Sequence, residues 1–124
     1  MPVFIHFFNG LSDDISRHYY EKEYRDDIVI EINQKFYEVY FFTKDALEYE
    51  MRAEGFFAFP GLIILDQITR EKICSSIEGL ISVGFFENFK GYDDNPVNNR
   101  FTKKWYANDT PVFSNKEEIV ELAL

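Results

Sequence analysis

The chain contains only two histidines, the side chains that most often carry acid–base chemistry or bind metals near neutral pH. His6 lies within the apolar, aromatic run VFIHFF (3–8), a setting that favours a structural histidine satisfied by hydrogen bonds. His18 lies in SRHYYEKEY, where we expect it to be exposed or packed on its tyrosines. The two residues lack the i,i+4 spacing of a helical zinc pair, so the sequence predicts no metal site.

The candidate nucleophiles have no supporting context. Cys74 follows Ile73 and lies three residues before Ile77, which is the pattern of a small buried residue on a helix. Ser75 and Ser76 have no G-x-S-x-G context, and the scattered glycines form no phosphate-binding loop. The sequence therefore predicts neither covalent catalysis nor a nucleotide cofactor.

Three pairs of adjacent aspartates, Asp13-Asp14, Asp26-Asp27 and Asp93-Asp94, are the remaining candidates for acid–base chemistry. Neighbouring side chains on a strand or a helix point in different directions, so adjacency does not make a catalytic pair. The pairs also lack the order of ligands found in a calcium-binding loop. We therefore expect a protein that acts by binding, with no cofactor, no metal and no enzymatic activity.

The composition is acidic and rich in aromatic residues. Thirteen basic and 22 acidic residues give a formal net charge of −9, and aromatic residues make up 19% of the 124-residue chain. Such a charge repels phosphate backbones and anionic membrane surfaces but attracts basic proteins. No run resembles a signal peptide or a membrane span. We expect a cytoplasmic, soluble protein that binds neither nucleic acid nor membrane, although an acidic charge is also ordinary among soluble proteins.

Apolar patterning predicts the elements that carry these side chains. The run 3–8 is typical of a strand buried on both faces. Within 11–25, the pattern predicts a helix that begins at Ser12, and residues 27–43 alternate as a β-hairpin with its turn near Gln34-Lys35.

The middle of the chain predicts two helices around one strand. The first helix occupies 44–54, with Asp45 as its cap and Gly55 just past its end. Its core-facing residues are expected to be Ala46, Leu47 and Met51. Residues 62–65 form the most apolar strand, and Thr69 predicts the start of the second helix. Its apolar stripe consists of Ile73, Ile77, Leu80 and Ile81, and Gly84 is expected to end it.

The remaining residues predict a strand at 100–108 and a short terminal helix, because Ser114 and Glu117 have capping-box spacing. The apolar residues of that helix are Ile119, Val120, Leu122 and Leu124. The order of elements predicts one α+β (mixed α/β) domain over residues 1–124. Its sheet is expected to be mostly antiparallel or mixed, with about four to six strands packed by about three helices. Strand order does not follow from the sequence.

The stretch GFFENFKGYDDNPVNN (84–99) sets aromatic residues beside acids. Because the helical stripe ends at Gly84, we expect Phe85 and Phe86 in the core and the residues after them at the surface. The candidates there for contact with a partner are Phe89, Tyr92, Asp93, Asp94 and Asn95. Three further candidates on the helix predicted at 44–54 are Glu48, Glu50 and Glu54. An ordinary exposed loop and a solvated helix face are the alternative interpretation.

Four features suggest a class of protein: small size with acidity, aromatic density, the strand-then-helix segment PGLIILDQITREKICSSIEGLISVGFF, and the ending PVFSNKEEIVELAL. In these the chain resembles bacterial immunity proteins of contact-dependent growth-inhibition and other polymorphic toxin systems. The resemblance implies a non-catalytic cytoplasmic protein that binds the C-terminal domain of its cognate toxin and blocks the active site. Such toxins are often basic nucleases, for which an acidic inhibitor partly mimics nucleic acid. Immunity families share no common fold, so the resemblance implies no architecture.

Two other functions stay open at this point. An adaptor subunit of an unrelated complex would have the same acidity and aromatic surface. A small hydrolytic enzyme would use His6, His18 or carboxylates, and replacing either histidine with alanine would then abolish turnover in an intact fold.

Overall fold

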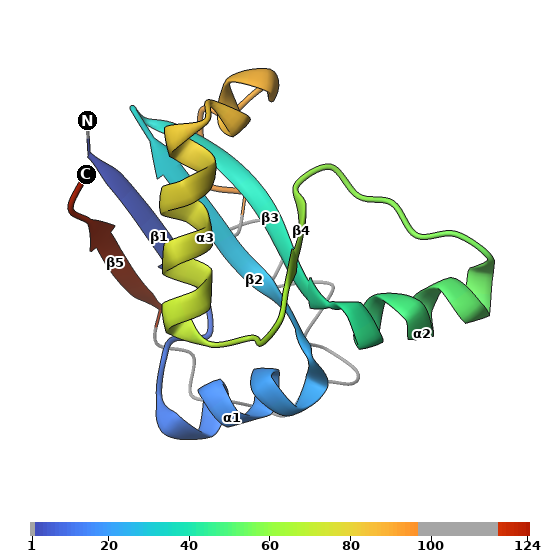
Figure 1. Cartoon of the computed structure of the whole chain (residues 1–124). Helices are drawn as coiled ribbons and strands as arrows, with labels where there is room; N and C mark the ends of the chain where they lie inside the picture. The colour runs from blue at the N-terminus through green and yellow to red at the C-terminus, as the bar shows by residue number, and fades with distance from the viewer. Residues whose placement is uncertain (1, 97–116) are drawn as a thin grey trace.

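One mixed sheet organises the chain, with its strands in the order β4-β3-β2-β1-β5 (Figure 1). The computed structural model describes residues 2–96 and 117–124. The strands are β1 (Val3–Phe7), β2 (Tyr24–Ile32), β3 (Lys35–Thr43), β4 (Leu62–Leu65) and β5 (Glu118–Leu122). β3 and β4 are parallel, and the other neighbours are antiparallel.

Three α-helices accompany the sheet, and the predicted α+β single domain is confirmed. They are α1 (Asp13–Lys22), α2 (Lys44–Glu54) and α3 (Arg70–Ser82), followed by the 3-10 turn η1 (Phe85–Asn88). The Ser12 and Thr69 side chains accept hydrogen bonds from the first turns of α1 and α3, as their sequence positions predict.

The central hairpin turns at Asn33 and Gln34, both with positive φ, one residue before the predicted turn. A two-residue turn with both residues in the left-handed region matches the twist of the strands that it joins. The turn sets the register of β2 and β3, and alternation then directs Ile28, Ile30 and Val39 to the same face.

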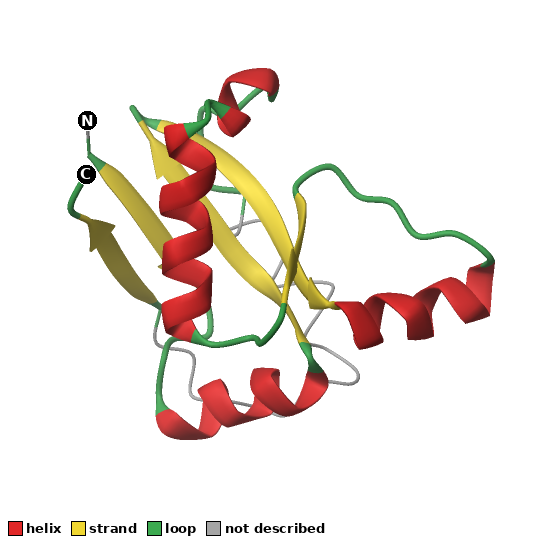
Figure 2. Ribbon diagram, in the orientation of Figure 1, coloured by secondary structure: helices red, strands yellow, loops and turns green. Residues whose placement is uncertain are grey.

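The main core lies between that face of the sheet and α3, which crosses it diagonally (Figure 2). Ile73 and Ile77 of α3 are fully buried, and Leu80 and Ile81 pack at the margin, so the predicted stripe is confirmed. Phe86 is buried, and Phe85 packs beside it. The strand residues buried against α3 include Val3, Ile5, Phe7, Ile28, Ile30, Val39 and Phe41.

The predicted terminal helix is wrong, because residues Glu118–Leu122 form β5. β5 pairs antiparallel with β1, with Leu122 opposite Val3 and Val120 opposite Ile5. A short apolar run fits either a helix or a strand, and here the exposed edge of β1 decides. The predicted strand at 100–108 and the predicted cap Ser114 lie outside the described residues.

The predicted packing of α2 is also wrong. None of its residues is buried: Ala46 and Leu47 are half-buried, and Met51 is 44% exposed. The N-cap is Thr43 rather than Asp45, and Gly55 ends the helix with φ 80°, as expected. Because α3 already covers the face of the sheet that carries the core, α2 leaves the end of β3 and projects away from the sheet (Figure 1).

A buried ion pair closes the end of the sheet nearest α1. A bulge in β2 between Arg25 and Ile28 turns both Arg25 and Asp27 into this end. Arg25 Nε lies 2.6 Å from Asp27 Oδ1, and its terminal nitrogen donates to the Gly10 carbonyl oxygen at 2.6 Å. The guanidinium also lies over the ring of Tyr19, 4.4 Å from its centroid, which attaches α1 to the sheet.

Asp27→Asn is expected to lower the free energy of unfolding by about 3 kcal/mol, because the Arg25 charge stays buried without its carboxylate. Denaturant titration measures this loss. The matched control is Asp14→Asn, which removes an exposed carboxylate 3.8 Å from Arg17 and should change stability by less than about 0.5 kcal/mol. Equal losses in the two variants would contradict a structural role for the buried pair.

Candidate functional site

A cleft of about 270 Å³, lined mostly by aromatic residues, lies beside the outer edge of β3, the edge that faces away from β2. We call it the aromatic cleft. Its lining residues are Tyr37, Glu38, Tyr40, Phe59, Pro60, Gly61, Phe85, Phe86, Phe89, Lys90 and Tyr92. They come from three separate segments: β3, the loop before β4, and the chain from η1 to Tyr92.

Two backbone contacts place the walls of the aromatic cleft along β3. At one end, Phe36 and Tyr92 exchange both backbone hydrogen bonds, at 2.9 and 2.8 Å, and form an isolated antiparallel bridge. At the other end, Tyr40 N–H donates to the Gly61 carbonyl oxygen at 3.0 Å, and β4 pairs from there onward. The cleft therefore lies beside the part of β3 between these two partners.

Two glycines allow the walls to approach β3 closely. A Cβ at Gly61, where φ is +82°, would overlap the backbone carbonyl oxygen of Glu38. A Cβ at Gly91 would lie 2.8 Å from the Lys35 Cβ and 3.0 Å from the Tyr37 ring. Both positions therefore need glycine for the walls to stand where they do.

Ring contacts hold the two walls in place. Phe59 packs against Tyr40 on one side, with ring centroids 5.1 Å apart. On the other side Phe85 contacts Phe89 at 4.9 Å, and it also contacts the buried Phe86 at 5.2 Å. The walls are thus extensions of the core rather than loose side chains, which favours a preformed site.

The charged groups that line the aromatic cleft are the Glu38 carboxylate and the Lys90 ammonium group. Tyr40 donates its hydroxyl hydrogen to Glu38 Oε2 at 2.7 Å, which fixes the half-buried carboxylate beside the rings. Lys90 is exposed. Just outside the cleft, Lys35 forms an ion pair with Asp93 and holds the pKa of that carboxyl below its usual value by a hydrogen bond and by its charge.

Only some of the five residues predicted from the stretch 84–99 lie in the aromatic cleft. Phe89 and Tyr92 line the aromatic cleft, with Phe89 half-buried and Tyr92 exposed. Asp93 pairs with Lys35, Asp94 is exposed beside it, and Asn95 is half-buried. Because the field of Asp93 is offset by Lys35, Asp94 is the stronger source of negative potential at this end.

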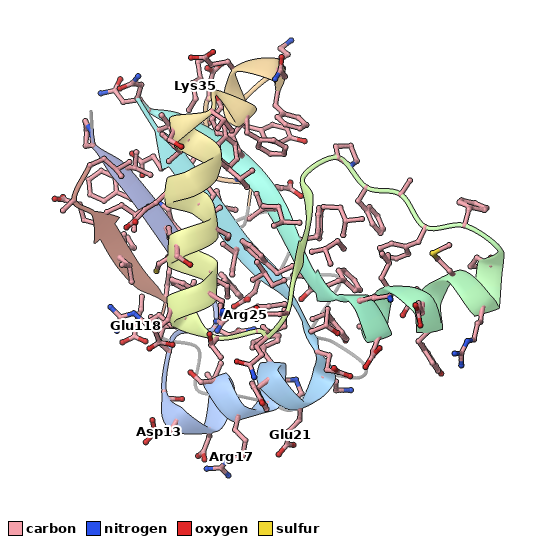
Figure 3. All side chains as sticks on the ribbon, viewed as in Figure 1. Asp13, Arg17, Glu21, Arg25, Lys35 and Glu118 are labelled. Atoms are coloured by element: carbon pink, nitrogen blue, oxygen red, sulfur yellow. The ribbon has the colours of Figure 1, made fainter. Side chains whose placement is uncertain are left out.

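The other three predicted residues lie on α2, at the opposite end of β3. Glu48 and Glu54 are exposed, and Glu50 is half-buried. Burial, together with the charges of Asp26 and Glu50, raises the pKa of the Tyr24 hydroxyl. Figure 3 shows Lys35, the partner of Asp93, at the far end of the sheet from α2. Seven residue steps along β3, from Phe36 to Thr43, correspond to about 23 Å.

One segment connects the three glutamates of α2 with the aromatic cleft. We call residues 44–61, which comprise α2 and the loop after it, the arm. Phe57 of the arm packs against Phe42, with centroids 4.9 Å apart, and Phe59 packs against both Phe57 and Tyr40. The loop therefore runs along β3 from the end that carries α2 to the aromatic cleft.

No motif in the sequence identifies Tyr37, Glu38, Tyr40 or Phe59 as site residues. One wall of the cleft has a partial signal in the sequence, because FFAFPG concentrates three phenylalanines immediately before a turn. Nothing local in the sequence indicates that this run meets β3 and Phe89.

His6 is engaged by two carboxylates on the face of the sheet opposite α3. Its Nε2 lies 2.8 Å from Glu31 Oε1, and its Nδ1 lies 3.1 Å from Glu117 Oε1. The ring is buried, and both nitrogens can donate to the two carboxylates when the imidazole is doubly protonated. This arrangement ties β1 and β2 to the residue before β5 and occupies both nitrogens.

The other candidates for catalysis lie on different elements: Cys74 on α3, His18 on α1 and Asp27 on β2. Burial raises the pKa of the Cys74 thiol and lowers the pKa of His18. Asp27 is committed to the pair with Arg25. Among residues 2–96 and 117–124, no three side chains of His, Cys, Asp or Glu gather as a metal site.

Comparison of the chain with protein-family models, with curated proteins and with solved structures found no match. Within the part of the chain that the structure describes, no helix combines the length and the apolar character that a membrane crossing needs.

Gly61→Ala is expected to destabilise the protein by at least about 1 kcal/mol more than Gly55→Ala, because only the first adds overpacking to backbone strain. The two glycines have nearly the same φ, +82° and +80°, but a Cβ at Gly55 meets no atom within 4 Å. Chemical denaturation of both variants isolates the close approach of Gly61 to β3. Equal destabilisation would show that the loop does not press against Glu38.

Proposed function

We propose that this chain is an immunity protein: a non-catalytic inhibitor that binds the basic C-terminal domain of a cognate toxin and occludes its active site. The observation that carries the proposal is the exposure of the arm. The arm is an ordered, capped helix and loop that bury little of themselves in their own domain and present aromatic and acidic side chains to solvent.

The exposed apolar side chains of the arm suit a protein interface. Tyr49 and Phe56 are each 71% exposed, and Met51 lies between them in the chain. Isolated helices of 11 residues are marginally stable in water, and a helix usually buries an apolar face to compensate. Aromatic residues and methionine are enriched in interfaces, where a few such anchors supply most of the binding energy. A partner that covers α2 would supply the burial that its own domain does not.

The charge of the arm matches a basic partner. Four acids (Asp45, Glu48, Glu50 and Glu54) oppose Lys44 and Arg52, which leaves a net charge of −2 on a chain whose total is −9. Complementary charge speeds encounter and rejects other partners, while aromatic anchors slow dissociation. In this proposal the interface follows β3 from α2 to Asp94 and includes Glu48, Glu50, Glu54, Phe89, Tyr92, Asp93 and Asn95.

The double substitution Tyr49→Ala/Phe56→Ala is expected to weaken toxin binding by at least about tenfold, because truncating interface anchors removes most of the contact energy. The proposal requires a toxin gene directly upstream of the gene for this chain. The C-terminal domain of that toxin is the binding partner in this test, and calorimetry measures the dissociation constant.

The matched control is Tyr20→Ala/Val83→Ala, which truncates two exposed apolar side chains on α1 and at the end of α3 and should leave binding unchanged. Failure of the unmodified chain to bind the toxin would overturn the proposed function. Binding without loss of toxin activity would instead indicate an adaptor.

Glu48→Lys/Asp94→Lys is expected to slow association with the toxin domain at low salt, and the difference should shrink as salt screens the charges. Stopped-flow mixing at several salt concentrations measures the association rate. Glu78→Lys/Glu121→Lys changes the net charge equally at exposed positions on α3 and β5 and should slow association less. Equal slowing by both pairs would mean that only the total charge matters.

A further inference from the structure

We infer that an extended segment of the partner pairs with the outer edge of β4 and lengthens the sheet by one strand. This segment carries a β-branched or aromatic residue between basic residues. The inference rests on the proposed function, because the segment belongs to the same toxin domain. It concerns a backbone surface that is separate from the exposed side chains of α2.

β4 lies at one end of the strand order, beside the arm (Figure 1). β3 pairs with one of its edges, and within the described part of the chain no strand pairs with the other edge. Edge strands usually carry charged side chains, prolines or bulges that prevent a further strand from adding to the sheet. The sequence of β4, LIIL, has none of these features, and only its length of four residues limits pairing.

The backbone groups of Ile64 are the ones that a further strand would use. In a β-strand, the N–H and C=O groups of successive residues point alternately to the two neighbouring strands. Gly61 faces β3, because its carbonyl oxygen accepts a hydrogen bond from Tyr40 N–H at 3.0 Å. Ile64, three residues later, therefore directs its N–H and C=O away from β3, where no described residue pairs with them. One residue of an antiparallel strand can exchange both hydrogen bonds with Ile64.

The side chain of Ile64 determines what fits opposite it. This side chain is 46% exposed and lies next to Phe42, its register partner on β3. Phe57 of the arm packs against Phe42, so the three side chains form a small apolar surface on the face of the sheet opposite α3. Cross-strand pairs of β-branched and aromatic residues stabilise a sheet, which favours such a residue in the added strand.

Charge favours a toxin strand over a second copy of this chain. The arm beside β4 has a net charge of −2 and the whole chain has −9, so two copies repel each other and a basic strand is attracted. At the end of β4, Asp66 lies 3.1 Å from Lys72, which offsets its charge. The acids of α2 are therefore the groups that would attract basic residues on either side of the central apolar one.

The test measures hydrogen exchange of the Ile64 backbone amide by NMR in the unmodified chain, with and without the toxin domain. We expect rapid exchange in the free chain and exchange at least about tenfold slower in the complex, because the added strand would bind this amide. The comparison amide is that of Asp14, in the exposed first turn of α1, where helix N–H groups have no partner in the helix. Its exchange should change by less than about twofold.

Ile64→Pro removes the same N–H and is expected to weaken toxin binding by about tenfold, because a carbonyl group of the added strand loses its donor. Proline is compatible with an edge strand where its missing N–H would face away from the sheet. The matched control is Ile64→Val, which keeps the amide and a β-branched side chain and should change binding by less than about threefold. If Ile64→Pro fails to fold, the exchange measurement on the unmodified chain decides.

Two results would overturn this inference alone. One is a toxin complex in which the Ile64 amide exchanges as fast as in the free chain. The other is protection of this amide without toxin that increases with protein concentration, which would assign the edge of β4 to a second copy of the chain.

Failure of the proposed function gives different results. Protection of the Ile64 amide in a complex whose toxin remains active would retain this inference and overturn the proposed function alone. Absence of any binding to the toxin domain would overturn both, because the added strand belongs to that domain.

Discussion

The arrangement of this protein depends on how the outer edge of β3 is paired. A β-strand presents backbone donors and acceptors along both edges, and in a folded protein these groups need partners. β2 pairs with the inner edge throughout, whereas the outer edge meets Tyr92 at Phe36 and β4 from Tyr40 onward. Two short partners in place of one long strand leave room between them for side chains from both, and the aromatic cleft occupies that place.

The same division explains the arm. β4 runs parallel to β3, so the chain must return from Thr43 to the level of Tyr40 before it can pair, which requires a connection outside the two strands. Such crossovers usually pack a helix onto the sheet. Here α3 follows β4 and covers the inner face, so α2 serves as the connection without becoming part of the core. A surface with exposed aromatic residues therefore arises from the topology.

The end of the sheet nearest α1 is held together in a different way. The bulge in β2 buries Arg25 and Asp27, and hydrogen bonds from Asn9 link the Asp27 carboxylate and the Tyr19 hydroxyl to the chain after β1. Asp27 is fully buried, so removing the Arg25–Asp27 pair from water is costly. Several hydrogen bonds made at once offset this cost. It joins β1, β2 and α1 in one arrangement.

Local signals in the sequence were sufficient for the elements whose ends are marked by their own residues. Ser12, Thr69 and Gly55 mark helix boundaries because the hydrogen bonds and backbone angles involved span only a few residues. The stripe of Ile73 and Ile77 and the alternation in β2 likewise predict which side faces the core. The acidity and the aromatic content that favour a basic protein partner are also properties of the sequence alone.

Only the tertiary structure decided the rest. Glu118–Leu122 became a strand because β1 had an edge to pair, which no pattern within those five residues reveals. The residues predicted to contact a partner lie in two groups, one on α2 and one at 89–95, and the length of β3 separates these groups. The aromatic cleft joins segments near residues 38, 60 and 89, so its composition follows from strand order and from the parallel pairing of β4. Local patterns record which side of an element is apolar, whereas contacts between distant segments depend on competition among all the available edges and faces.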